Sequence, residues 1–285
     1  MDKETFYLFG EILSRVLPFR VMDAALKILA VPIGRARGTL QAVEENLKYV
    51  LDSESTAGAD RIRELSKEVL KNFSSSLCDL AYSRRLSDAF IKKSVEIRGF
   101  EFLEEALSLK RKGAVLAGVH LGHWELGGTV LARKGYPVTA IALKHKNPIL
   151  QAAFQKRRDL NGLKIIPTGQ SLKNCYTCLK ENRVLAVMGD RLFAGQGIEV
   201  NFFGKKVAYP KGPARFALQA GAPILPVFCV ATHACPRKYL LEIWPPLEGL
   251  TEKDLTQAFA KKVEEMVKRY PEQWFVFQRF WEPVL

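Results

Sequence analysis

The sequence lacks several features that would assign a chain to a common class at once. It has no uninterrupted apolar run of about 18 residues or more, so no helix is expected to cross a bilayer. Its first residues, Asp2, Lys3 and Glu4 among them, do not match the start of a secretory signal peptide. Zinc-finger spacings, aromatic RNA-binding motifs and a basic tail are absent, which disfavours a nucleic-acid-binding protein.

Cysteine is scarce, with five residues in a chain of 285. An odd, small number excludes a disulfide scaffold and indicates a reducing compartment. Cys175 and Cys178 form a single C-x-x-C pair, and a zinc or redox site would need further ligands such as His233 and Cys235. Packing thiols are the simpler interpretation. We therefore expect no metal and no cofactor.

Positive charge, in contrast, is abundant. Lysine and arginine total 43 against 30 acidic residues, which gives a net charge of +13. Such an excess favours an anionic partner: nucleic acid, anionic lipid headgroups or an acidic protein. A hydrophobic content of 48% is ample for a buried core.

Residues 1–92 are predicted to be helical. Segment 6–33 is apolar but interrupted by charges, and Pro18 and Pro32 are expected to divide it. This pattern suits helices that lie in the headgroup plane of a membrane, or a helix pair packed on the domain. We interpret 1–92 as a membrane-associating helical region.

Residues 93–285 alternate between short apolar runs and amphipathic segments, which predicts an α/β domain with a central sheet flanked by helices. The predicted strands are 114–119, 138–143, 163–166, 184–188, 224–230 and 239–243. The predicted helices are 124–133, 148–160, 171–181, 211–220 and 255–270.

The segment with the most chemical information follows the first of these strands. His120 stands at the strand's carboxyl end, where α/β proteins place ligands, and Glu125 follows five positions later. The two can meet if His120 precedes the helix and Glu125 lies on its first turn, with Gly122 permitting the tight turn. Neutral imidazole is a natural general base, and a carboxylate on the other ring nitrogen fixes its tautomer. His123 is a competing candidate that we expect to flank the site.

This block and those after it resemble the bacterial lipid A biosynthesis (late) acyltransferases, over most of the chain from about residue 95. His120 to Glu125 resembles the family's H-x4-E motif. The other matching blocks are Asn147-Pro148 with Arg157-Arg158, 187–191, 200–204, 211–226, and 270–274 with Arg279. Arg191 departs from the Gln or His that is commoner there, and relatives with this architecture acylate phosphatidylinositol mannosides.

The resemblance implies an enzyme with a mixed sheet similar to that of glycerolipid acyltransferases. It implies transfer of a fatty acyl chain from acyl carrier protein or CoA to a hydroxyl of a lipid A precursor or related glycolipid. The place would be the cytoplasmic face of the bacterial inner membrane, bound peripherally or monotopically. His120 would be the base and Glu125 its partner.

Basic residues in the other blocks have physical interpretations of their own. Arg157, Arg158 and Arg191 could stabilise charge on the reacting carbonyl or bind an acceptor phosphate, or belong to a solvated basic face. Asp190 is expected to orient one of these arginines or to cap a helix. Phe202 and Phe203 could line an acyl channel, although core packing is the stronger interpretation. A basic stretch beside them could meet headgroups or acyl carrier protein, or simply be solvated: Lys205, Lys206, Lys211 and Arg215.

The sequence leaves three other functional classes open. A hydrolase would use water in place of the acceptor. A non-catalytic lipid-binding protein would bind vesicles without turnover. A nucleic-acid binder would show a steep dependence of affinity on salt.

Overall fold

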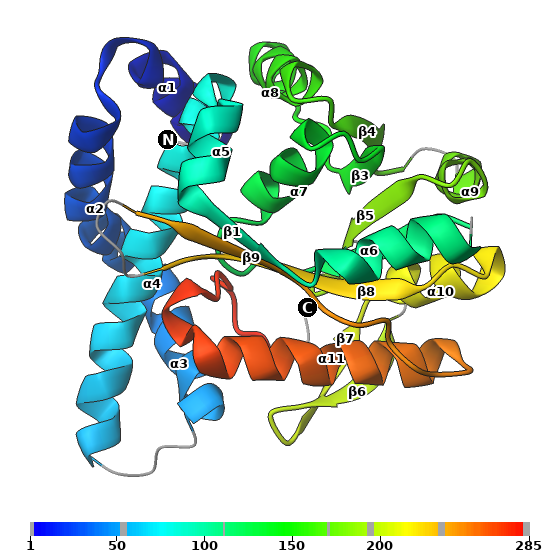
Figure 1. Ribbon diagram of the computed structural model, residues 1–285. Coiled ribbons are helices and arrows are strands. Elements are labelled where there is room, and N and C mark those ends of the chain that lie inside the picture. Colours follow the sequence, from blue (N-terminus) through cyan, green and yellow to red (C-terminus); the bar gives the residue numbers. More distant parts are fainter. Residues whose placement is uncertain are drawn as a thin grey trace.

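The computed structural model of the protein describes residues 3–51, 56–110, 112–169, 172–192, 197–232 and 237–281. Four helices come first and form the left side of Figure 1. They are α1 (Lys3–Val16), α2 (Phe19–Ala36), α3 (Thr39–Leu51) and α4 (Thr56–Tyr82). A short turn of 3-10 helix, η1 (Ser83–Arg85), and helix α5 (Asp88–Ser94) lead into the first strand.

The prolines of the helical region act differently from one another. Pro18 separates α1 from α2, as predicted, and stands at the N-cap of α2. Pro32 lies inside α2, so the prediction that it breaks the helix is wrong. The hydrogen bond that it removes belongs to the carbonyl of Ile28, whose residue is 74% exposed, so water can replace the lost donor.

A seven-stranded mixed sheet forms the centre of the molecule, which confirms the predicted fold class. Its order is β1-β9-β8-β2-β5-β3-β4, and β8 and β9 pair antiparallel while the other neighbours are parallel. A separate hairpin, β6-β7, stands beside it (Figure 1). The strands are β1 (Val95–Arg98), β2 (Ala114–Gly118), β3 (Val138–Ala142), β4 (Lys164–Pro167), β5 (Val184–Met188), β6 (Ile198–Phe202), β7 (Lys205–Tyr209), β8 (Ile224–Ala231) and β9 (Tyr239–Ile243).

Helices cover both faces of this sheet because its central strands are buried on both sides, as in β2, where all five residues are buried. One face packs against α5, α6 and α7, the other against α9, α10, α11 and the hairpin. The remaining helical elements are α6 (Phe100–Glu105), η2 (Ala106–Lys110), α7 (Trp124–Arg133), α8 (Pro148–Leu160), α9 (Leu172–Lys180), α10 (Gly212–Ala220), α11 (Glu252–Arg269) and η3 (Pro271–Gln273).

The C-terminal segment after α11 returns to the middle of the fold. Trp274 pairs with Leu121, and Phe275 donates its backbone N–H to the carbonyl of His120 at 2.9 Å. Asn46 of α3 donates to the carbonyls of Val276 and Gln278. The segment therefore ties the helical region to the turn that follows β2.

Candidate active site

A cavity of about 1090 Å³ opens over the carboxyl ends of the central strands. His120, Glu125, Arg158 and Arg191 line it, together with side chains of the N-terminal helices. Ligands of open α/β sheets bind at this edge, so the position agrees with the expectation for His120.

The partner of His120 is Asp190. The Nδ1 atom of His120 lies 2.8 Å from Oδ1 of Asp190, and its backbone N–H donates to Oδ2 at 2.8 Å. Asp190 is 2% exposed, whereas 16% of the His120 side chain is accessible. The expectation that Asp190 orients an arginine is thus corrected: both of its oxygens serve His120.

Strand register explains this pair. Strands β2 and β5 are parallel neighbours with Gly118 opposite Met188. His120 and Asp190 each stand two residues beyond these partners, and the N–H of Gly189 donates to the carbonyl of Gly118 at 2.8 Å. The carboxyl ends of these two neighbouring strands therefore bring His120 and Asp190 into contact.

The ionisation of Asp190 fixes the tautomer of His120. Burial opposes the charged form, but the hydrogen bonds from His120, the attraction of His120 in its protonated form and the charge of Arg191 outweigh it, so the pKa of Asp190 lies below its ordinary value. An ionised carboxylate only accepts, so Nδ1 of His120 carries the proton. Nε2 is then the ring nitrogen left to take a proton from a substrate.

Glu125 does not take the place predicted for it. Its Oε1 accepts from the Nη2 atom of Arg158 at 3.0 Å, and no hydrogen bond joins it to His120 in the described part of the chain. The reason is direction: Glu125 lies on the first turn of α7 and faces α8, while Asp190 already occupies the inner side of the imidazole. Both Glu125 and Arg158 line the cavity.

The predicted arginines separate into two groups. Arg158 and Arg191 line the cavity, and Arg191 donates to the backbone carbonyl of Phe275. Arg157 does not line it; it is buried against Glu11 of α1, and its guanidinium lies 4.4 Å from the ring centre of Phe154. The two side chains diverge because adjacent residues of a helix point about 100° apart.

The backbone of the turn between β2 and α7 requires glycine at position 122. Gly122 has φ of +62°, and a Cβ atom there would collide with the carbonyl oxygen of Cys229. This confirms the role predicted for Gly122. The Trp124 ring packs edge-on against His120, with ring centres 5.1 Å apart. The turn thus presents His120 in one orientation.

Two groups of apolar side chains line the cavity near His120. The first group, named the inner arm, comes from α7 and the sheet and consists of small and aliphatic residues: Leu116, Gly118, Gly127, Ala140, Ile165, Ala186 and Val227. The second group, named the outer arm, comes from α2 and α4 and consists of Leu26, Leu29, Ile33, Phe73, Leu77 and Leu80.

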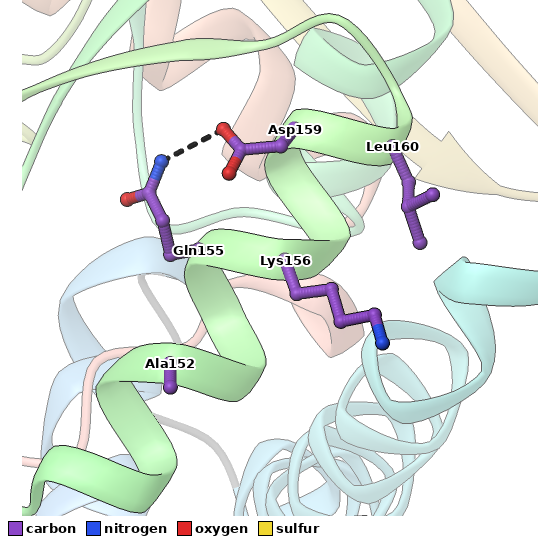
Figure 2. A pocket seen from close by; sticks show the side chains of 5 residues that line it. All are labelled: Ala152, Gln155, Lys156, Asp159 and Leu160. Atoms are coloured by element: carbon purple, nitrogen blue, oxygen red, sulfur yellow. Dashed lines mark hydrogen bonds between the residues drawn. The ribbon is translucent and has the colours of Figure 1, made fainter.

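Other features weighed in the sequence lie away from this cavity. Phe202 is fully buried among aromatic rings and Phe203 packs on the same cluster, which supports core packing. Cys175 and Cys178 are buried free thiols, while His233 and Cys235 lie outside the described residues. Figure 2 shows a second, open hollow on α8, where Gln155 donates to Asp159 at 2.9 Å. Its lining contains no histidine, serine or cysteine.

Relatives share this chain's sequence over long stretches. Phosphatidylinositol mannoside acyltransferase of Mycobacterium tuberculosis is 31% identical over 65% of this chain and 59% of its own length. Lipid A biosynthesis acyltransferase of Haemophilus influenzae is 23% identical over 94% of this chain and 83% of its own. Lipid A biosynthesis palmitoleoyltransferase of Escherichia coli is 26% identical over 76% of this chain and 72% of its own.

The aligned stretch thus spans less than two thirds of the mycobacterial relative. Among solved structures, the 1-acyl-sn-glycerophosphate acyltransferase of Thermotoga maritima aligns with a TM-score of 0.43 at 14% identity, over 91% of this chain and 100% of its own. The profile of the bacterial lipid A biosynthesis acyltransferases matches residues 4–282. The chain belongs to this family.

Proposed function

We propose that the protein transfers a fatty acyl group from a thioester of acyl carrier protein or CoA to a hydroxyl of a membrane glycolipid. The observation that carries this proposal is the His120–Asp190 pair, whose histidine lines a cavity with two groups of apolar side chains. A base that carries its proton on Nδ1 is prepared to accept another on Nε2. The inner arm provides room for an acyl chain beside that base.

The reaction needs no covalent intermediate on the protein. The acceptor oxygen attacks the thioester carbonyl carbon while its proton passes to Nε2 of His120, and Asp190 stabilises the imidazolium. The tetrahedral species then expels the thiolate, which takes the proton from Nε2 of His120. The C–O bond replaces the C–S bond, and no oxidant or reductant is required.

Glu125 contributes through Arg158 in this proposal. Their ion pair holds the guanidinium at the cavity wall, where its charge can meet the developing oxyanion or an acceptor phosphate. Arg191 supplies a second positive charge at the cavity wall for the oxyanion or the acceptor phosphate. Arg157, bound to Glu11, is reassigned from substrate binding to the packing of α1 on α8.

The lining of the cavity favours an anionic acceptor. Its cations outnumber its carboxylates: Arg37, Lys144, Arg158, Arg191 and Lys211 stand against Asp79 and Glu125. Lipid A precursors carry phosphates and so do phosphatidylinositol mannosides, so the charge fits both. The 31% identity to a mycobacterial relative supports the second, and the coverage of the Haemophilus relative supports the first.

We place the reaction at the cytoplasmic face of the bacterial inner membrane, with residues 1–92 as the membrane-associating region. No helix within the described ranges is long and apolar enough to span a bilayer. Large apolar side chains are nevertheless exposed on α1 and α2: Ile12, Val16, Val21, Ile28 and Leu29. Arg15, Arg20 and Arg35 are exposed on the same helices, as is Arg37 just after α2, and these residues suit anionic headgroups.

The direct test is a transfer assay with the purified full chain in detergent micelles. Radiolabelled long-chain acyl-CoA and acyl-acyl-carrier-protein would be offered with a lipid A precursor or a phosphatidylinositol mannoside. The wild type should form a labelled glycolipid, and His120→Ala should lower turnover at least about 1000-fold while remaining folded. Near-normal transfer by His120→Ala would refute the mechanism. Release of free fatty acid without any glycolipid product would identify a hydrolase, and vesicle binding without turnover a lipid-binding protein.

A further inference from the structure

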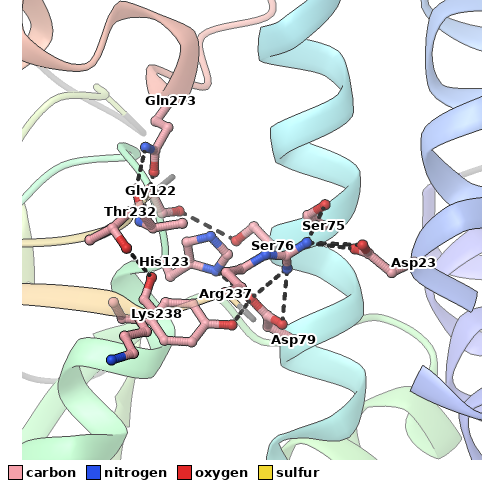
Figure 3. Close-up of polar contacts among 12 residues, drawn as sticks. Asp23, Ser75, Ser76, Asp79, Gly122, His123, Thr232, Arg237, Lys238 and Gln273 are labelled. Carbon is pink, nitrogen blue, oxygen red and sulfur yellow. Dashed lines mark hydrogen bonds and ion pairs between the residues drawn. The ribbon is translucent and has the colours of Figure 1, made fainter. Parts of the chain in front are cut away.

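A second histidine–aspartate contact lies three residues beyond His120. His123 is 3% exposed, and its Nδ1 lies 2.7 Å from Oδ2 of Asp79 on α4. The approach is off the line of an ideal hydrogen bond, and no other described group pairs with this nitrogen. The side chain of His123 therefore faces α4 of the N-terminal helices. Figure 3 shows it between the β2–α7 turn and α4.

Asp79 is the centre of a partly buried polar cluster. Arg237 donates to both of its oxygens at 3.3 Å (Figure 3). The Tyr239 hydroxyl donates to Oδ2 of Asp79 at 2.8 Å. Burial and then the charge of Asp79 raise the pKa of Tyr239, so its hydroxyl stays a donor. Arg237 also bridges to Asp23 of α2, at 2.9 and 3.0 Å.

Charges in this cluster balance without His123. Asp23 and Asp79 supply two negative charges, and Arg237 and Lys27 supply two positive ones, with Lys27 2.8 Å from Asp23. The aspartates are therefore matched in charge by Arg237 and Lys27, and His123 adds a further polar contact to Asp79.

The same turn is anchored on its other sides by backbone contacts. The N–H of His123 donates to the carbonyl of Cys229 at 2.6 Å, and the N–H of Gly122 to that of Gln273 at 2.8 Å. Ser76, three residues before Asp79 on α4, donates to the carbonyl of Gly122 at 3.3 Å. Strand β8 and the C-terminal segment hold one side of the turn, and α4 holds the other through Ser76 and Asp79.

We infer that His123 and Asp79 are positioning residues: their contact holds the turn that carries His120, and so aligns the base with Asp190 and the cavity. This inference rests on the proposed function, because it concerns the same base. It assigns a role to a histidine that neither touches Asp190 nor takes a proton in the reaction. A displacement of about 1 Å in a catalytic base can lower a rate about 100-fold. The contact that holds one side of the turn 119–123 is therefore expected to affect the rate.

Two substitutions at position 123 separate the polar contact from simple packing. His123→Phe keeps a ring against Tyr239, whose ring centre lies 5.0 Å from that of His123, but removes the N–H. His123→Asn gives up the ring but offers an amide N–H close to the position of Nδ1. Asp79→Asn is the companion variant, since it weakens the same contact from α4.

The first measurement is kcat and KM in the micelle assay, at a temperature where circular dichroism shows each variant folded. We expect His123→Phe to lower kcat about 10- to 100-fold with KM within about twofold, and His123→Asn to recover most of kcat. Asp79→Asn should lower kcat less in the His123→Phe background than it does alone, because the His123–Asp79 contact is already absent there. A Phe variant with normal kcat, or an Asn variant as slow as the Phe variant, would overturn the assignment.

The second measurement does not need turnover. The proton on Nδ1 of His120, bonded to Asp190, should give a downfield proton resonance that His120→Ala removes. His123→Phe should broaden or shift that resonance, and His123→Asn should restore it. An unchanged resonance in His123→Phe would contradict the inference even if the protein proved not to be an acyltransferase. A wild type with the resonance but no transfer would contradict the proposed function alone.

Discussion

Asp190 holds His120 at two points, the ring Nδ1 and the backbone nitrogen, both at 2.8 Å. The first contact sets the tautomer and the second sets the position of the residue that bears the ring. A carboxylate bound only to the ring would leave the backbone free to shift. Asp190 is therefore the member of the site on which the geometry of the base depends most directly.

Asp190→Asn should be the most damaging conservative change after loss of His120 itself. The amide can donate to Nδ1 and so leave the proton on Nε2, which is the wrong tautomer for a base. We expect kcat to fall about 1000- to 10,000-fold with the fold retained. The measurement is initial-rate transfer of a labelled acyl group. Asp159→Asn, on the exposed side of α8, is the matched control and should leave the rate unchanged.

Glu125→Gln tests whether Glu125 acts through Arg158, in contrast to Asp190, which contacts His120 directly. The amide oxygen can still accept from Arg158 but without the charge, so kcat should fall by only about 10- to 100-fold. A loss as large as that of Asp190→Asn would contradict the indirect role and return Glu125 to the imidazole. The two variants should be assayed side by side with the same donor.

Acid should weaken the fold through Asp190. Because the pKa of Asp190 is lower in the folded protein than in the unfolded chain, its ionised form stabilises the fold at pH above the unfolded value of about 4. That contribution is lost as the pH falls through the lower, folded value. Urea unfolding from pH 7 to pH 3 should show the stability difference between wild type and Asp190→Asn shrinking below pH of about 4. Asp60→Asn, on the exposed surface of α4, should show no such change, and a pH-independent difference for Asp190→Asn would refute the prediction.

Much of the fold was predictable because its strands are short apolar runs with clear ends. Helices 124–133 and 148–160 match α7 and α8 residue for residue, and the strand 184–188 matches β5. The hairpin β6-β7 and strand β1 were missed. Their side chains alternate between buried and exposed, which dilutes the apolar signal.

The site was predictable only in part, for a topological reason. Closeness in sequence predicts that Glu125 pairs with His120, whereas Asp190 lies 70 residues away. Strand order brings them together, and a list of strands does not give that order. One signal was present: His120 and Asp190 each follow an apolar strand by the same short interval, which places them together if the two strands are neighbours.

The inner arm of the cavity should set the acyl chain that the enzyme prefers. Ala186 of β5 lines this arm opposite α7, with Ala140 beside it on β3. Because protein interiors are close-packed, Ala186→Leu should shift the preferred donor by roughly two to four carbons toward shorter chains. The measurement is competition among acyl thioesters of graded length, with products resolved by mass spectrometry. The same substitution at exposed Ala152 of α8 is the control, and an unchanged length profile for Ala186→Leu would place the acyl chain elsewhere.

The exposed isoleucines of the N-terminal helices should hold the protein on a membrane surface. Ile12 and Ile28 are 53% and 74% exposed, at positions where a soluble surface gains nothing from such side chains. Moving each into the acyl boundary contributes about 2 kcal/mol, so Ile28→Ser should weaken binding to anionic vesicles about tenfold or more, and the double variant further. Co-sedimentation measures this, and activity in detergent micelles should stay normal. Leu250 is 93% exposed but precedes α11, so Leu250→Ser provides the control. Equal losses for Leu250→Ser and Ile28→Ser would mean that exposed apolar surface in general, and not the face of α1 and α2, meets the bilayer.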